Sequence, residues 1–224
     1  MLYLVPTPVG NLSDMTFRAV EVLKACDVVL TEDTRTSGKL LKHFDIDRPM
    51  WSFHAFNEHQ ALKGIIDHLQ QGKKIAMISD AGTPGISDPG YLLVRECVSL
   101  GIKVSCLPGA TAFVPALVSS GMTTDKFYFE GFLPHKKGRQ TRWKYLSTLD
   151  VTMILYESPH RLLKCLTEIK DYLGPKRRVC VAREISKIYE EFNTLSVEEA
   201  ILHYTKKPAK GEIVIVIEGK TTDN

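Results

Sequence analysis

Residues 75–90 hold the densest group of candidate ligand-binding side chains in this sequence. Their apolar start is typical of a buried parallel strand, and the twelve residues from Ser79 to Gly90 then include three glycines, two prolines and two aspartates. Asp80 and Asp88 offer carboxylate acceptors to hydroxyl or amino groups, and glycine lets a ligand approach the backbone closely. We expect a binding loop, because ordinary connections in α/β units need only about two to six residues. The alternative is a plain connection in which Asp88 caps the next helix and Pro89 begins it.

Two other loops carry side chains that can accept protons or contact anions. His54 and Glu58 follow one expected strand, and His160 and Arg161 follow another. An imidazole or a carboxylate can act as a general base, and a guanidinium can anchor a phosphate. A capping turn with solvated side chains explains His160 and Arg161 equally well.

Positive charge is most concentrated in residues 135–144, where five lysines and arginines surround Trp143. Such a stretch neutralises phosphates while its aromatic ring stacks on an unpaired base. A solvated helix face with Trp143 in the core is the alternative, and the sequence does not decide between them. In the first interpretation the candidate RNA contacts are Lys136, Lys137, Arg139 and Arg142, together with Arg35 and Arg161 in loops after strands.

Apolar runs alternate with amphipathic stretches from the first residue, which is typical of βαβ units on a mostly parallel sheet. In the first half the sequence predicts strands at residues 2–5, 27–31, 50–53, 74–79 and 103–107, and helices at 14–25, 57–71 and 91–100. Ser13 or Asp14 is the expected cap of the first helix. Ligands bind at the carboxyl ends of parallel strands, so we expect the loops at Pro6, Asp80 and Pro108 to share one edge.

The second half predicts a mixed sheet with further helices. Strands are expected at residues 127–129, 151–156, 178–182 and 212–218, helices at 139–148, 159–173 and 197–205, and a further antiparallel strand at 188–195. The pattern lapses into small polar residues at 119–125. We therefore predict two α/β domains, 1–120 and 125–224, with the ligand in a cleft between them.

Composition limits the class of protein. The 224 residues are 44% hydrophobic and 25% charged, as in soluble globular proteins, and the net charge of +3 does not by itself identify a nucleic-acid binder. Neither a membrane-spanning run nor a secretion leader is recognisable, so the cytoplasm is the expected location. The five cysteines are scattered and indicate neither disulfides nor a zinc site.

Nucleotide-binding fingerprints are missing from the sequence. The turn after residues 2–5 lacks the Gly-x-Gly-x-x-Gly pattern, and there is no Gly-x-x-x-x-Gly-Lys-[Ser/Thr] loop. A ligand that carries a nucleoside without a phosphate chain fits these loops better.

The loop motifs taken together carry a family resemblance. They are LVPTPVGNL (4–12), EDTR (32–35), His54 with Asn57 and Glu58, SDAGTP (79–84), DPG (88–90), EGFLP (130–134), YESPHRL (156–162), ARE (182–184) and KGE (210–212). As a set they resemble the ribosomal small-subunit RNA 2'-O-methyltransferase I family, a branch of the tetrapyrrole (corrin/porphyrin) methylases, over nearly the whole chain. Gly109-Ala110-Thr111 departs from the Gly-Pro-Ser that is frequent in the family.

This resemblance implies S-adenosylmethionine as cofactor, no metal, and typically a homodimer. The implied substrate is the ribose 2'-hydroxyl of a cytidine in the decoding region of 16S ribosomal RNA. Many relatives continue into a small helical C-terminal segment, whereas this sequence ends at Asn224, which shifts the expected RNA contact to residues 135–144. The implied cofactor contacts are Pro8, Asp80, Ala81, Gly82, Thr83, Ala112, Tyr156, Ala182 and, on the strand after Gly211, Ile213.

The catalytic base stays open at this point among His54, Glu58 and His160. Two other functions also stay open. One is methylation of a small tetrapyrrole-like acceptor by the same fold, which predicts a cavity for an acidic substrate. The other is a non-catalytic RNA-binding or ribosome-assembly module that retains the pocket.

Overall fold

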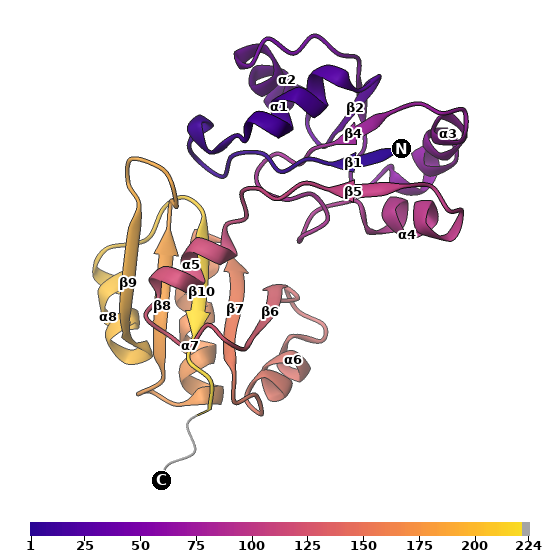
Figure 1. The fold of residues 1–224 in the computed structure, drawn as a ribbon. Helices are drawn as coiled ribbons and strands as arrows, with labels where there is room; N and C mark the ends of the chain where they lie inside the picture. The colour runs from indigo at the N-terminus through magenta and orange to yellow at the C-terminus, as the bar shows by residue number, and fades with distance from the viewer. Residues whose placement is uncertain (221–224) are drawn as a thin grey trace. The chain divides into compact units, whose positions relative to one another are not determined.

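A computed structural model describes residues 1–220 and divides the chain into two compact units (Figure 1). The first is Met1–Thr111, and the second begins at Ala112. The predicted boundary at residues 120–125 lies one helix later in the chain, because α5 (Phe113–Ser119) packs against β10 (Ile213–Ile217) and so belongs with the second unit. Residues 221–224 of the predicted second domain lie outside the described residues.

Short apolar strands build the sheet of the first unit. Within residues 1–111 five strands pair in parallel in the order β3–β2–β4–β1–β5, which confirms the parallel sheet that the sequence predicts. The strands are β1 (Leu2–Leu4), β2 (Val28–Thr31), β3 (Met50–Ser52), β4 (Ile75–Met77) and β5 (Val104–Cys106). The helices are α1 (Phe17–Ala25), α2 (Thr34–His43), α3 (Glu58–Gln70) and α4 (Tyr91–Ser99), preceded by the 3-10 turn η1 (Leu12–Asp14).

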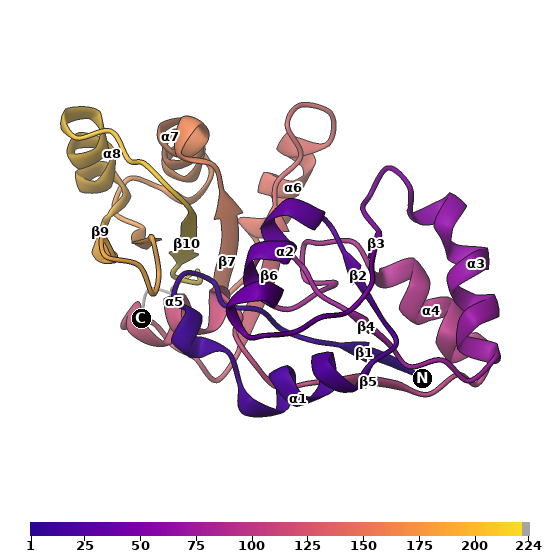
Figure 2. The same ribbon diagram turned by 90° about the horizontal axis from the view of Figure 1, so that it is seen from above.

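Helices cover both faces of this sheet (Figures 1 and 2). Leu23 of α1 and Leu41 of α2 pack with one face, while Ile65 of α3 and Leu93 of α4 pack with the other. The strand β4 lies between β2 and β1, and the helix that follows it covers the opposite face from the helices that follow its two neighbours. Loops diverge at such a switch point, which is where open α/β sheets bind ligands.

One local expectation for this unit is wrong, and one helix was not predicted. The cap of α1 is Thr16, whose side chain accepts from the Ala19 amide, because Ser13 and Asp14 are already part of η1. The sequence also does not predict α2, which has few apolar residues. That helix is capped by Asp33, whose side chain accepts from the Arg35 amide.

The second unit is a mixed sheet. Within residues 112–220 five strands lie in the order β6–β7–β10–β8–β9, with β6 and β7 parallel and the other neighbours antiparallel. Besides β10, the strands are β6 (Phe127–Phe132), β7 (Thr152–Glu157), β8 (Arg178–Arg183) and β9 (Glu191–Ser196). The pairing of β9 with β8 confirms the predicted antiparallel strand. Besides α5, the helices are α6 (Arg139–Leu146), α7 (Leu162–Leu173) and α8 (Val197–Lys206), with a 3-10 turn η2 (Pro159–Arg161) before α7.

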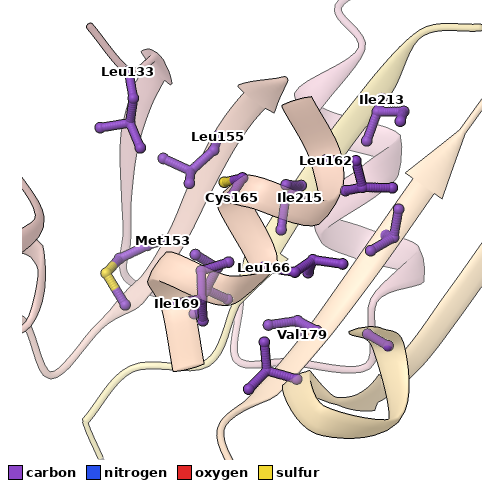
Figure 3. Packing of buried hydrophobic residues seen from close by; sticks show 14 of the residues in the cluster. Leu133, Met153, Leu155, Leu162, Cys165, Leu166, Ile169, Val179, Ile213 and Ile215 are labelled. Atoms are coloured by element: carbon purple, nitrogen blue, oxygen red, sulfur yellow. The ribbon is translucent and has the colours of Figure 1, made fainter. Parts of the chain in front are cut away.

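The main core of this unit lies between the sheet and α6, α7 and α8. Leu166 and Ile169 of α7 pack there against strand residues such as Leu155 and Val179 (Figure 3). On the opposite face, α5 covers the sheet with Ala116 and Leu117 (Figure 1). Within residues 1–220 no helix is both long and apolar enough to cross a membrane.

Candidate ligand-binding edges

The loops after β1 and β4 are joined through their backbones. Thr7 and Gly82 each donate an amide hydrogen to the other's carbonyl at 2.9 Å. The Thr7 hydroxyl donates to the Ser79 carbonyl at 3.0 Å, and the Ser79 hydroxyl donates to the Gly82 carbonyl at 3.1 Å. The residues from Ser79 to Gly82 are therefore held in place by the protein itself, so little ordering is left for a ligand to impose.

The loop after β5 joins the same edge. The Thr83 hydroxyl donates to the Ala110 carbonyl at 2.9 Å and lies 2.7 Å from the Thr111 hydroxyl. Gly109 packs so closely on Pro6 that a Cβ there would lie 2.6 Å from the proline Cβ. These contacts confirm that the loops at Pro6, Asp80 and Pro108 share one edge of the sheet.

Carboxylates gather beside this linked edge. The Asp33 amide donates to Oδ1 of Asp80 at 3.3 Å. Burial, together with the nearby charges of Glu32 and Asp80, raises the pKa of Asp88 to about 7, although a hydrogen bond from Ser79 opposes the shift. Burial and the charge of Asp80 raise the pKa of Glu32, and burial together with the charge of Asp33 raises that of Asp80. The expected cap role of Asp88 is not seen, because Gly90 occupies the N-cap position of α4.

His54 and Glu58 lie in the turn that leads from β3 into α3. The Asn57 side chain fixes this turn by accepting from the His54 amide at 2.8 Å and donating to the Ser52 carbonyl at 3.0 Å. Nδ1 of His54 is buried and, within residues 1–220, has no hydrogen-bond partner. His54 also lies close enough to Glu32 to lower the pKa of that carboxyl, against the larger effect of burial. The base candidate His54 therefore lies within electrostatic range of Glu32.

Arg35 extends from the first turn of α2, and its side chain is 87% exposed. Asp33 holds it through hydrogen bonds from Nε at 3.2 Å and Nη2 at 2.8 Å. These hydrogen bonds lower the pKa of Asp33 to about 2. Arg35 is thus an exposed cation with a fixed direction.

Three of the candidate cofactor residues lie on one face of the second unit. Tyr156 and Ala182 both pair with Val214 across neighbouring strands, and all three side chains lie on the α5 face of the sheet, where Ala112 also packs. Ile213 was expected with them, but its side chain turns to the other face, among Leu162 and the rest of the α7 core (Figure 3). The correction follows from the two-residue period of a strand, which puts Val214 rather than Ile213 beside Tyr156.

The basic stretch at residues 135–144 is only partly a surface. Trp143 is 1% exposed, and its Nε1 donates to Glu168 at 3.1 Å, so the ring belongs to the core. Arg139 is 4% exposed and its guanidinium binds both oxygens of Glu168 and the Pro134 carbonyl. The expectation that Arg139 forms part of an exposed RNA-binding face is therefore wrong, because burial and pairing use its donors.

The remaining basic residues divide into paired and exposed ones. Arg142 donates to Glu130 through Nε at 2.7 Å and to the Tyr128 hydroxyl at 2.7 Å. Lys136 and Lys137 are exposed in the loop before α6. Of the predicted cations in this stretch, these two lysines are exposed, whereas Arg142 is partly exposed and paired with Glu130.

Arg161 and His160 lie after β7, in the turn η2. Arg161 donates from Nε to the buried Glu157 at 2.7 Å, and its Nη1 lies 2.6 Å from Nδ1 of His135. His160 is exposed, and its amide donates to the Ser158 hydroxyl at 3.4 Å. The capping turn weighed from the sequence is therefore present, and it leaves Arg161 partly exposed as well.

Sequence reasoning did not single out Glu32 or Val214 as site residues. Glu32 directly follows β2, as Asp80 follows β4, so the shared edge of a parallel sheet was a usable signal for it. No comparable signal marks Val214, since every residue of β10 is buried. Within residues 1–220 no group of three or more histidine, cysteine, aspartate or glutamate side chains could hold a metal ion.

Known proteins resemble this chain over its full length. The tetrapyrrole (corrin/porphyrin) methylase family matches residues 1–201. The Ribosomal RNA small subunit methyltransferase I of Synechocystis sp. is 49% identical over 225 residues, which cover 100% of this chain and 81% of that protein. The protein of the same name from Thermotoga maritima is 45% identical over 219 residues, or 98% of each chain.

Solved structures share the fold at low identity. The uroporphyrin-III C-methyltransferase of Thermus thermophilus, complexed with S-adenyl homocysteine, superposes with a TM-score of 0.65 at 16% identity. The match covers 97% of this chain and 96% of that one. At this identity the likeness concerns the fold, and it agrees with the two α/β units described above.

Proposed function

Because this chain belongs to the tetrapyrrole (corrin/porphyrin) methylases and, within them, to the ribosomal RNA small subunit methyltransferase I family, we propose that it methylates ribosomal RNA. The methyl donor is S-adenosylmethionine, and the acceptor is the ribose 2'-hydroxyl of a cytidine in the decoding region of 16S RNA. The full-length identity to relatives of that name carries the proposal. The linked edge of the first unit supports it, since it holds a binding loop in place.

The residues at the two edges fit this cofactor chemically. Asp80 is exposed and uses Oδ1 to accept from the Asp33 amide, which leaves Oδ2 for a hydroxyl or amino group. On the α5 face of the second sheet Ala182 and Val214 are buried, and the partly exposed Tyr156 offers an aromatic ring to a flat base. The proposed cofactor contacts are Pro8, Asp80, Ala81, Gly82 and Thr83 in the first unit and Ala112, Tyr156, Ala182 and Val214 in the second. When bound, the cofactor supplies a methyl group on a positively charged sulfur.

The protein must supply orientation and a proton acceptor. A ribose hydroxyl is a weak nucleophile until its proton leaves, and a positioned base adds roughly 10²- to 10⁴-fold in rate. We assign this role to His54, because it lies within electrostatic range of Glu32 and its turn is fixed by Asn57. Glu58 and His160 are the alternatives. Replacement of His54 by Ala should lower kcat within that range, whereas His160→Ala should leave kcat within a few-fold of the parent enzyme.

Contacts with RNA are assigned to the accessible cations. These are Arg35, Lys136 and Lys137, which are exposed, and Arg161, which is partly exposed and also bound to Glu157. Arg139 and Arg142 are bound to Glu168 and Glu130. Phosphate contacts of this kind make binding dependent on salt concentration. A cytoplasmic location follows from the proposed substrate, and a homodimer follows from the family resemblance. Light scattering of the purified protein tests the dimer.

The experiment offers three acceptors in parallel with radiolabelled S-adenosylmethionine. Small ribosomal subunits that lack the modification, naked 16S RNA and a uroporphyrinogen-type tetrapyrrole are each incubated with the enzyme. Label should enter one of the two RNA samples and not the tetrapyrrole. Label in the tetrapyrrole alone would support the small-acceptor methylase, and RNA binding without transfer would support a non-catalytic module.

A further inference from the structure

Phe56 is a large apolar side chain that the fold leaves in solvent. It is 96% exposed, the highest value among the exposed large apolar side chains of residues 1–220. An exposed aromatic ring offers a flat face on which a planar partner can stack.

The backbone, not burial of the ring, sets the position of Phe56. The amides of Asn57 and Glu58 both donate to the His54 carbonyl at 3.0 Å, which closes a tight turn around Ala55 and Phe56. The Asn57 side chain fastens the same turn on both sides. A side chain held at the tip of such a turn can meet a ligand without a large loss of backbone freedom.

This turn and an exposed cation follow neighbouring strands of the sheet. The turn follows β3, the neighbour of β2 in the parallel sheet, and Arg35 follows β2. Asp33 binds Nε and Nη2 of Arg35, and within residues 1–220 Nη1 makes no hydrogen bond. The same edge of the sheet therefore carries an exposed guanidinium in the first turn of α2 and an exposed aromatic ring in the turn after β3.

An aromatic face next to a cation is the chemistry that recognises unpaired nucleotides. The ring can stack on any of the four bases, and the cation contacts the backbone phosphate. We propose that Phe56 stacks on an unpaired base of the RNA substrate while Arg35 contacts a neighbouring phosphate. This inference rests on the proposed RNA methylation and names the contacts that hold the nucleotide.

The placement also relates the stacked base to the proposed chemistry. The ring centroids of Phe56 and His54 lie 6.1 Å apart, in an edge-on arrangement. A nucleotide stacked on Phe56 is thereby brought next to the imidazole assigned as base. Phe56 is thus a substrate-positioning residue, and its loss should act mainly on KM.

Three substitutions of Phe56 test stacking against simple apolar contact. Phe56→Ala and Phe56→Leu should each weaken binding of small ribosomal subunits, by about 5- to 150-fold for the alanine variant, which is the range measured for stacked bases. Phe56→Trp should restore binding. Because the ring is in solvent, none of these changes should shift the thermal unfolding midpoint.

A matched control removes apolar surface elsewhere. Val98 is 65% exposed in the last turn of α4, at the opposite end of the sheet from the loops after the strands. Val98→Ala should leave KM unchanged. Arg35→Ala should raise KM and reduce the salt dependence of binding by about one phosphate contact.

A spectroscopic readout separates direct stacking from an indirect effect. The indole in Phe56→Trp should lose fluorescence when RNA binds, while the parent protein, with its own two tryptophans, should change much less. Equal KM values for the parent, Phe56→Ala and Phe56→Leu enzymes, or an unquenched indole, would overturn the inference while RNA methylation by the parent enzyme stands. Failure of the parent enzyme to methylate any RNA would instead reject the proposed function.

Discussion

Thr7 and Gly82 exchange two backbone hydrogen bonds of 2.9 Å, which fasten the loop after β4 to the loop after β1. Gly82 adopts a φ of +84° to do so, a conformation that costs other residues roughly 1–2 kcal/mol. The Thr83 hydroxyl links the same loop to the loop after β5 by donating to the Ala110 carbonyl. The loop after β4 is therefore part of the rigid sheet edge.

Substitution of Gly82 should damage cofactor binding through the backbone. Gly82→Ala introduces strain at positive φ and places a methyl group 3.5 Å from the Val9 side chain, so we expect a destabilisation of about 1–2 kcal/mol and weaker binding of S-adenosylmethionine. Gly64→Ala is the control, since it lies inside α3 with nothing within 4 Å of the added Cβ. That change should stabilise the protein by about 0.5–1 kcal/mol. Urea unfolding and calorimetry measure the two effects.

Asp80 is expected to bind the cofactor directly. Asp80→Ala removes an acceptor whose hydrogen bonds to a ligand contribute about 1.5–3 kcal/mol each when charged, so affinity for S-adenosylmethionine should fall by tenfold or more. Isothermal calorimetry measures this. Asp67→Ala, on the exposed side of α3, is the matched loss of one negative charge. Equal affinities of the Asp80 and Asp67 variants would remove Asp80 from the site.

The corrected basic stretch makes opposite predictions for its buried and exposed members. Arg139→Ala removes the main partner of the partly exposed Glu168 and one partner of the buried Glu157, and it should destabilise the protein by about 3–5 kcal/mol. Lys136→Ala with Lys137→Ala should leave stability unchanged. The double lysine variant should instead weaken RNA binding and lower the salt slope by about one to two contacts. An Arg139 variant that unfolds like the parent protein would contradict the buried network.

The strands of the first sheet and the edge that its loops share could be predicted from the sequence. Which charged side chains are paired and which are exposed could not. Short apolar runs specify all five strands of the first sheet, and their parallel order brings the loops at Pro6, Asp80 and Pro108 together. The cluster at residues 135–144 was ambiguous because pairing partners such as Glu168 lie far away in the sequence. The grouping of Glu32, Asp80 and Asp88 could not be predicted either, because it depends on the order of the strands in the sheet.

Asp88 should make stability depend on pH. Its pKa of about 7 in the folded state lies above its ordinary value of 3.8, so the folded state binds more protons than the unfolded state between these values. Stability from this group is therefore fully present below about pH 4 and is lost as the pH rises through 7. Asp88→Asn should be more stable than the parent protein at pH 8 and lose less stability between pH 5 and 8. Urea unfolding of both proteins at pH 5 and 8 measures this. An equal change in the stability of the two proteins between these pH values would contradict it.

The most direct test is to identify the methylated atom. Small ribosomal subunits from cells that lack the modification are incubated with the enzyme and S-adenosylmethionine, and the 16S RNA is digested to nucleosides for mass spectrometry. We predict one new 2'-O-methylcytidine, which maps to the decoding region. RNA that gains no methyl group, or gains one on a base instead of a ribose, would contradict the account.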